Sequence, residues 1–214
     1  MFSLNEIEVT GKRAARGAGL PWGIAEEAGK AARWLVERGL PGPRLLAEVL
    51  TRNDGRDYAD LAPVSDQGTW QAPSGRLCPL IAGAALADRA SELAAGGEIA
   101  LAATSLPLLL APYAACVAGQ TGAAIEIGWT GATLTLMPDG CAIVAEGDAL
   151  TVRSAEHVYC RRARAIPAAM TFTADRDVDA DTWSRLGDFA QRTFAPATEA
   201  SRLAGAGAGL TDND

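Results

Sequence analysis

Forty consecutive positions, from Ile99 to Pro138, carry a single charged side chain, Glu126. A run this poor in charge marks the core of the chain, because apolar side chains gain stability by leaving water. The run is also long enough to cross a membrane, but threonine, serine, two prolines and the segment 119–122 interrupt it. We therefore expect no membrane span. We expect a strand over 99–103, a helix over about 106–118 and a strand over 123–129.

The residues after this helix alternate between apolar and polar side chains. Ile125 and Ile127 flank Glu126, and leucines alternate with threonines over 133–136. A period of two is typical of strands that bury one face. Further strands are predicted over 142–145, 150–153 and 157–160, after the turn signal Pro138-Asp139-Gly140. The middle of the chain is thus expected to be a mainly antiparallel sheet.

Helix signals fill the first third of the chain. Ser3 and Glu6 have the spacing of a capping box, which predicts a helix to about Arg16. Pro21 suits the first turn of a second helix, which Gly39 ends. Its apolar stripe is Ile24, Ala28, Ala31 and Leu35. A third helix is expected over 43–51.

The rest of the chain completes the predicted fold. Residues 52–75 read as one long loop around Trp70, and 79–94 as a helix rich in small residues. A last helix is capped by Asp181 and buries Trp183, Leu186, Ala190 and Phe194. We expect one α+β domain over 1–214, with a helical N-terminal third, a central sheet, a C-terminal helix and a docked glycine-rich tail.

Composition excludes several classes of function. The formal net charge is −7, so the surface repels phosphate backbones and anionic lipid. The densest basic group, Arg153, Arg161, Arg162 and Arg164, reads as a solvated strand edge. Neither nucleic acid nor a membrane is an expected partner. The four cysteines form no close pair and there is one histidine, so we predict no metal site. The N-terminus does not read as a signal peptide, and a cytoplasmic location is expected.

Four residues are candidates for acid/base chemistry. Glu126 is the lone charge of the core run, and burial would raise its pKa; on a wet face it would be an ordinary strand residue. His157 is the sole imidazole, which suits proton transfer near neutral pH, although a lone histidine is more often structural. Glu27 and Lys30 lie one turn apart on the second helix.

Trp22, Glu26 and Trp34 are candidate ligand-binding residues on that same helix. Carboxylates beside two tryptophans suit a cationic or polar small molecule. The alternative is a salt-bridged helix face, since Glu26 and Lys30 have the favoured spacing of four.

The tail is the third candidate region. Alternating glycines let backbone approach a ligand, and the terminal aspartates add oxygen atoms. No strand precedes them and no helix follows, so a dinucleotide fingerprint is excluded. The tail is either solvated or docked on the body, and we favour docking. Its ligand-binding candidates are Arg202, Gly205, Gly207, Gly209, Asp212 and Asp214.

Two resemblances bear on function. The runs SLNEIE (3–8), ARGAGLPWGIAEEAGKA (15–31) and SRLAGAGAGLTDND (201–214) resemble an uncharacterised proteobacterial family catalogued only as a domain of unknown function. That resemblance implies a bacterial, cytoplasmic protein and no activity. The helical opening is also loosely similar to the N-terminal hairpin of type-2 malate/lactate dehydrogenases. Those enzymes rely on a histidine just after the hairpin; residues 39–43 contain none, and the chain is much shorter, so we set that activity aside.

Two functions stay open at this stage. One is a small-molecule-binding protein or enzyme subunit with an acid/base site near the docked tail. The other is a non-catalytic assembly or regulatory protein that uses the tail and the small-residue helices as an interaction surface. No cofactor is indicated, and a homo-oligomer is compatible with the alanine-rich stretches.

Overall fold

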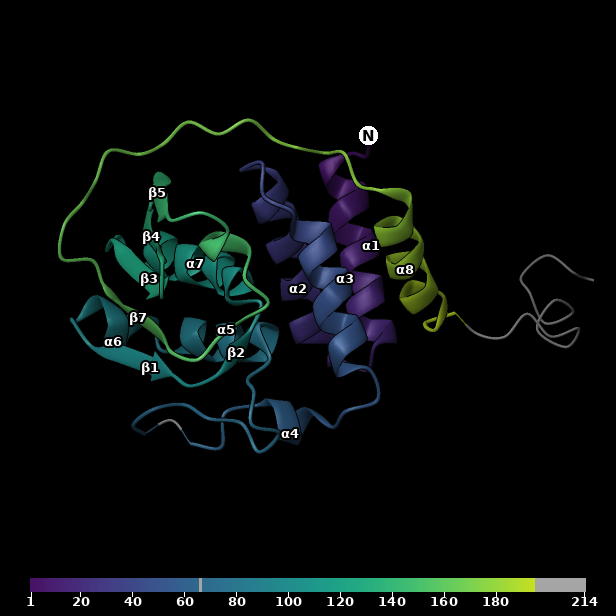
Figure 1. Cartoon of the computed structure of the whole chain (residues 1–214), viewed down its shortest axis with the longest axis horizontal. Coiled ribbons are helices and arrows are strands. Elements are labelled where there is room, and N and C mark those ends of the chain that lie inside the picture. The colour runs from purple at the N-terminus through teal and green to yellow at the C-terminus, as the bar shows by residue number, and fades with distance from the viewer. Residues whose placement is uncertain (66, 195–214) are drawn as a thin grey trace, which may run out of the picture.

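The computed structural model describes residues 1–65 and 67–194. A five-stranded antiparallel sheet lies at one end, and helices are layered on one of its faces (Figure 1). This arrangement confirms the α+β class, with helices at both ends of the chain and the sheet in the middle.

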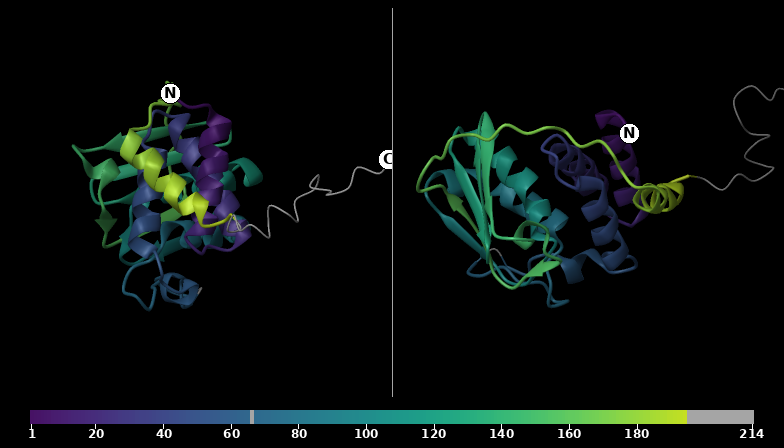
Figure 2. Two further views of the ribbon diagram at one scale, coloured as in Figure 1. Left: turned by 90° about the vertical axis from the view of Figure 1, so that its right-hand side faces the viewer. Right: turned by 45° about the horizontal axis from the view of Figure 1, so that its top comes forward.

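Four helices form the bundle farthest from the sheet: α1 (Leu4–Gly17), α2 (Trp22–Val36), α3 (Gly42–Asn53) and α8 (Ala180–Gln191). The predicted capping box begins α1, because Ser3 Oγ accepts from the Glu6 amide at 3.1 Å and the Glu6 carboxylate accepts from the Ser3 amide at 2.8 Å. Helix α2 contacts α1 and α3, and α8 contacts α1 and α3 from outside (Figure 2). The N-terminal third is therefore helical, as predicted.

The sheet is a meander with one strand inserted. Strands β3 (Ile125–Trp129), β4 (Ala132–Met137) and β5 (Gly140–Ala145) follow one another, and β7 (Val158–Arg162) lies between β3 and β1 (Glu98–Leu101). All pairs are antiparallel. A separate two-stranded pair joins β2 (Thr104–Ser105) to β6 (Ser154–Ala155).

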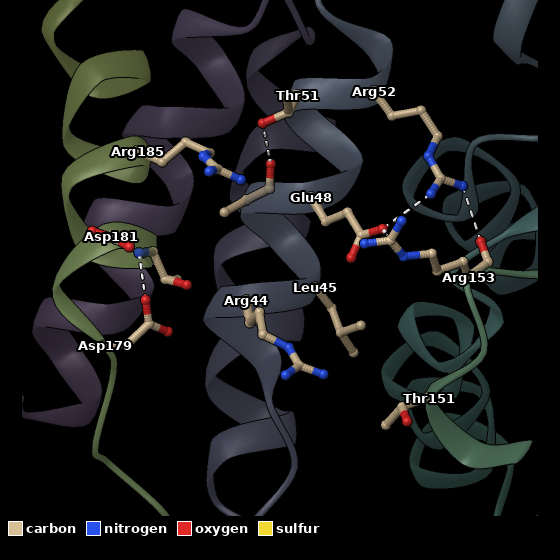
Figure 3. A pocket seen from close by; sticks show the side chains of 12 residues that line it. Arg44, Leu45, Glu48, Thr51, Arg52, Thr151, Arg153, Asp179, Asp181 and Arg185 are labelled. Atoms are coloured by element: carbon tan, nitrogen blue, oxygen red, sulfur yellow. Dashed lines mark hydrogen bonds and ion pairs between the residues drawn. The ribbon is translucent and has the colours of Figure 1, made fainter. Parts of the chain in front are cut away.

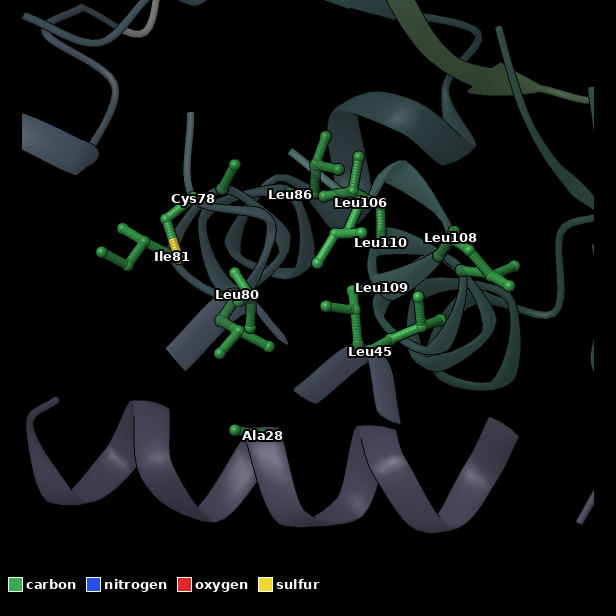
Figure 4. Close-up of a cluster of buried hydrophobic side chains, with 14 of the residues drawn as sticks. Ala28, Leu45, Cys78, Leu80, Ile81, Leu86, Leu106, Leu108, Leu109 and Leu110 are labelled. Carbon is green, nitrogen blue, oxygen red and sulfur yellow. The ribbon is translucent and has the colours of Figure 1, made fainter. Parts of the chain in front are cut away.

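A middle layer of helices separates the sheet from the bundle. It consists of α5 (Pro79–Asp88), α6 (Ala90–Ala94), the 3₁₀ helix η1 (Pro107–Leu110) and α7 (Ala111–Thr121). Helix α7 contacts β3 and β4 on one side and α2 and α5 on the other. Figure 4 shows leucines of α5 and η1 gathered next to Ala28 of α2. The uncharged run of the sequence thus provides η1 and α7 of this layer and the strands β3 and β4.

Three predicted elements differ from the observed ones. The helix over 79–94 breaks at Arg89 into α5 and α6. Residues 149–151 form the 3₁₀ helix η2 (Ala149–Thr151) in place of the start of the predicted strand over 150–153; the Thr151 amide donates to Asp148 O at 3.0 Å within this turn and is not free for a strand ladder. Asp179, and not Asp181, caps α8, because its carboxylate accepts from the Thr182 amide at 2.8 Å.

The structure also differs from the predicted last helix and from the predicted loop over 52–75. Phe194 lies beyond α8 and is 57 % exposed, so it is not part of the buried face. The loop over 52–75 contains the short helix α4 (Tyr58–Leu61). Trp70 in that loop is buried because its backbone pairs with β1, donating to Ala100 O at 2.8 Å and accepting from Ala102 N at 2.9 Å.

Residues 163–179 form an extended connection that crosses from the sheet to α8 along one side of the molecule (Figure 1). Met170 donates its amide to Cys141 O of β5 at 2.9 Å, and Asp175 donates to Val36 O of α2 at 3.0 Å. The Phe2 amide donates to Arg176 O at 3.1 Å, and the rings of Phe2 and Trp183 stack 3.8 Å apart. The connection therefore fixes where α8 lies on the bundle.

No helix within the described part of the chain is both long and apolar enough to cross a membrane. The glycine-rich tail predicted to dock lies outside the described residues.

We predict that Gly29→Ala lowers the free energy of unfolding by about 1–3 kcal/mol, the usual cost of overpacking a tight contact. A Cβ at Gly29 would fall on the carbonyl oxygen of Glu8 in α1, so the two helices would have to move apart. Gly23→Ala is the matched control in the same helix, because a Cβ there meets nothing within 4 Å. Urea unfolding of both variants tests this, and equal midpoints for the two would contradict it.

Candidate functional site

A pocket of about 260 Å³ lies between α2 and α7. Glu27, Lys30 and Trp34 contribute from α2, and they share one face because they are spaced three and four residues apart. From α7, Pro112, Tyr113 and Cys116 form the opposite wall. The structure thus brings together three residues that the sequence proposed as catalytic or ligand-binding, and it adds five others, because Ala31 and Ala115 also line the pocket.

An ion pair forms the polar end of this pocket. Lys30 Nζ lies 2.8 Å from Glu27 Oε1, and both side chains are about half exposed. The hydrogen bond to Glu27 raises the pKa of Lys30, and the neighbouring carboxylates add to this. An exposed pair of this kind contributes little to stability, about 0–1 kcal/mol. Its polar atoms are therefore available to a ligand at small cost to the fold.

The Tyr113 hydroxyl is the exceptional group of the pocket. The side chain is 3 % exposed, and within the described residues its hydroxyl has no hydrogen-bond partner. The ring is held against α5, where a Cβ on Gly83 would overlap it. Burial raises the pKa of this phenol, so it stays protonated. A buried hydroxyl without a partner costs roughly 1–3 kcal/mol, and such a group calls for an explanation.

Cys116 is the exposed thiol of the chain, whereas Cys78, Cys141 and Cys160 are buried. The Gln120 amide donates to its sulfur at 3.2 Å. Partial burial raises the pKa of this thiol, and the Glu27 charge adds to the rise, while Lys30 and Gln120 act against it. Cys116 is thus a chemical reporter of the charges in the pocket.

Glu126 does not reach this pocket. It points from β3 to the face of the sheet away from the helices, where Arg161 of β7 donates to Glu126 Oε1 at 2.7 and 3.0 Å. Arg161 also contacts Glu98 at 3.3 Å and lies 4.5 Å from the centre of the Tyr159 ring. The carboxylate is 15 % exposed because this arginine covers it. His157 lies apart from both groups, exposed in the turn between β6 and β7.

The other ligand-binding candidates of α2 lie outside the pocket lining. Trp22 is 57 % exposed and has the Arg16 guanidinium 5.2 Å from its ring centre. Glu26 pairs with Lys12 of α1 at 3.1 Å, and this hydrogen bond lowers its pKa. In place of the expected Glu26–Lys30 pair, Glu26 pairs with Lys12 and Lys30 pairs with Glu27. Arg38 lies 3.8 Å over the Trp34 ring, so one face of that ring is already occupied.

The tail candidates, Arg202, Gly205, Gly207, Gly209, Asp212 and Asp214, all lie outside the described residues. Among the described residues, no cluster of three or more histidine, cysteine, aspartate or glutamate side chains could hold a metal ion.

A second and larger cavity, of about 660 Å³, lies between α3 and α8 (Figure 3). Four arginines line it: Arg44, Arg52, Arg153 and Arg185. In the sequence, Arg153 groups with Arg161, Arg162 and Arg164 as one predicted strand edge, and no pattern there indicates this cavity. The missed residues come from segments far apart in the chain, so no local pattern could have revealed them.

Comparisons with known proteins found a family model that matches the N-terminal part of the chain and a solved structure of similar fold. Residues 2–78 match the family model described as "Protein of unknown function (DUF3726)". The match covers the helical N-terminal third and ends just before α5. It confirms the resemblance to a family of unknown function, and it assigns no activity to the pocket. No curated protein matches the chain in sequence.

Among solved structures, a malate dehydrogenase from Entamoeba histolytica is similar in fold, with a TM-score of 0.52 and 13 % identity. The alignment covers 67 % of this chain and 48 % of that one, so this chain spans about half the length of that enzyme. At this identity the likeness shows the fold alone. Residues 39–43 lack the histidine on which type-2 malate/lactate dehydrogenases rely, and a likeness of fold does not supply that residue.

We predict that Cys116 reacts with iodoacetamide more slowly than a free thiol at pH 8, and that the two charges of the pocket shift its rate in opposite directions. Glu27→Gln removes a negative charge that raises the thiol pKa, so more thiolate forms and the reaction accelerates. Lys30→Met removes the opposing positive charge, so the reaction slows. Mass spectrometry of the labelled protein over pH 7–10 measures both rates; Glu48→Gln, outside the pocket, is the control. Shifts of the same sign in both variants would contradict this.

Proposed function

We propose that the protein binds a small polar metabolite in the pocket between α2 and α7, with Glu27 and Lys30 as the charged pair that recognises it. The observation that carries this proposal is that Tyr113, whose buried hydroxyl has no hydrogen-bond partner among the described residues, lines the same pocket as that ion pair. A ligand atom that accepts from this hydroxyl would remove its cost to the fold. Binding sites commonly combine apolar walls with a few polar groups of this kind.

The lining defines the chemistry of such a ligand. Trp34, Pro112 and the alanines Ala31 and Ala115 provide the apolar walls. The ion pair provides the polar end, and the pocket volume of 260 Å³ lies below the roughly 300–1,000 Å³ of sites for drug-sized ligands. The best fit is a small metabolite with one acceptor toward Tyr113 and a charged or polar group toward Lys30.

The ion pair would also orient the ligand. The raised pKa of Lys30 keeps its amine protonated at neutral pH, so it can donate a hydrogen bond to a ligand oxygen. The same rise makes the ammonium a weaker acid, so Lys30 would contribute a hydrogen bond and a positive charge to the site. Glu27, held 2.8 Å away, remains as the carboxylate partner. Glu126 and His157 have no part in this site, since neither lines the pocket. We propose no dehydrogenase activity from the likeness to malate dehydrogenase.

The assembly alternative has less support from the described residues. Ala82 and Gly83 of the small-residue helix α5 are buried, with the Tyr113 ring of α7 packed on Gly83, so these small residues serve a contact inside the chain. Self-association remains a prediction that a mass measurement in solution would test.

We predict that Tyr113→Phe raises the free energy of unfolding by up to about 1 kcal/mol while it weakens ligand binding. The substitution removes a buried hydroxyl that has no partner among the described residues, and with it the free-energy cost of burying that polar group. The ring that packs on Gly83 is kept. Thermal shift against a metabolite collection provides the ligand, since one at a hundred times its Kd adds about 2.7 kcal/mol. Tyr159→Phe, on the far face of the sheet, is the control. Ligands that bind Tyr113→Phe and Lys30→Met as tightly as the original protein would overturn the site.

The predicted contribution of the tail can be tested with the same ligand. If Arg202, Asp212 and Asp214 close over the pocket, a chain that ends at Phe194 should bind that ligand about tenfold or more weakly, as expected for the loss of a hydrogen bond to a charged group. Titration calorimetry of the two chains measures the difference. Equal affinities would remove the tail from the site and leave the pocket proposal intact.

A further inference from the structure

The cavity between α3 and α8 is independent of the proposed site. It shares no lining residue with the pocket between α2 and α7. Its floor comes from α3, one wall from α8, and the other from the segment around η2 and β6 (Figure 3). The residues that line it include four arginines and three carboxylates, on a chain whose net charge is −7.

Two of the arginines are held in place by one carboxylate. Glu48 Oε1 lies 3.0 Å from Arg52 Nη2 and 3.4 Å from Arg153 Nε. Arg52 also donates to Arg153 O at 2.9 Å and to Ser105 Oγ at 3.3 Å. One negative charge thus serves two guanidinium groups, and the Arg153 side chain is still 83 % exposed at the rim.

The backbone beneath Arg153 is fixed by a strained residue. Leu106 is buried with a φ of 42°, the left-handed region that side chains other than glycine rarely adopt. Its amide donates to Arg153 O at 3.0 Å, so that carbonyl accepts from both Leu106 and Arg52. Such strain tends to gather near functional sites.

The other two arginines, Arg44 on α3 and Arg185 on α8, make no ion pair or side-chain hydrogen bond with residues 1–65 or 67–194. Figure 3 shows Arg185 extending from α8 toward α3, and Arg44 on α3 among the other lining residues. Asp179 and Asp181 line the same cavity. The hydrogen bond from the Thr182 amide, through which Asp179 caps α8, lowers the pKa of that carboxylate, and the Arg44 charge adds to this. Among the described residues, neither guanidinium group is within ion-pair distance of a carboxylate, so both keep their hydrogen-bond donors for a ligand.

We propose that this cavity binds a small anion with at least two negative charges, held between Arg44 and Arg185 with Arg153 at the rim. The planar guanidinium fork suits phosphate and carboxylate oxygens, to which it donates two parallel hydrogen bonds. The Thr182 hydroxyl is a further donor in the lining, whereas Thr51 already donates to Ala47 O at 2.7 Å and Thr151 to Asp148 O at 3.5 Å. None of the lining residues is aromatic, so a nucleotide base would have no ring to stack on. The fitting class is a phosphorylated or polycarboxylate metabolite without a nucleobase.

Titration calorimetry of the full chain with pyrophosphate, inorganic phosphate and succinate, at constant ionic strength, tests the proposal. Saturable binding of at least one of these is expected, and the preferred probe separates phosphate from carboxylate chemistry. Arg44→Gln and Arg185→Gln should each weaken binding by about ten- to a hundredfold, the loss expected for a hydrogen bond to a charged group. The affinity of Arg44→Lys for the anion should lie between those of the original protein and Arg44→Gln, because lysine keeps the positive charge but loses the two parallel donors of the guanidinium group.

Arg164→Gln is the matched control, since it removes the same charge from an exposed position outside the cavity. Both cavity variants should keep the original melting temperature, because neither arginine makes an ion pair among the described residues. No saturable heat with any probe would overturn the site. If Arg164→Gln weakened anion binding as much as the cavity variants, the proposal would also be overturned, because the loss would then follow from the net charge of the protein and not from the cavity. Tyr113→Phe should leave anion binding unchanged, which separates this site from the metabolite pocket.

Discussion

The double-sided burial of α7 is the constraint on which the other layers depend. One side of α7 packs on strands β3 and β4 of the sheet. The other side packs on α2 of the bundle and on α5 of the middle layer. A helix in that position cannot carry charge, because an unpaired buried ion is costly. It also has to accept close neighbours, and Tyr113 packs so tightly on α5 that position 83 must be glycine. The unpaired Tyr113 hydroxyl stands out for this reason, since the layer around it is almost entirely apolar.

The bundle depends in turn on a connection that has no regular structure. Helix α8 follows the sheet in sequence but packs on α1 and α3 at the other end of the molecule. Residues 163–179 make that placement through hydrogen bonds to β5, to the end of α2 and to the N-terminus. The cavity with the four arginines exists only because α8 is carried there. A segment without secondary structure therefore helps to form one of the two proposed sites.

The two proposed sites have opposite character on one acidic chain. The pocket between α2 and α7 is small and mainly apolar, with one ion pair at its edge. The cavity between α3 and α8 is polar and contains two guanidinium groups that form no ion pair with the described part of the chain. Net charge sets the long-range field, which disfavours long polyanions such as nucleic acid. It does not prevent a small anion from binding where local arginines outnumber carboxylates.

Local spacing along the chain determined much of the fold and part of one site. The capping box at Ser3, the alternation around Glu126 and the face shared by Glu27, Lys30 and Trp34 each depend on residues a few positions apart, so they could be predicted from sequence. Only the tertiary structure decided which residues of other segments lie opposite these faces and side chains. It placed Tyr113 against the α2 face, Arg161 over Glu126, and Arg185 across from Arg44. These contacts join segments that are often a hundred residues apart, as Arg52 and Arg153 are, and no periodicity within one helix or strand encodes which segment will pack against it.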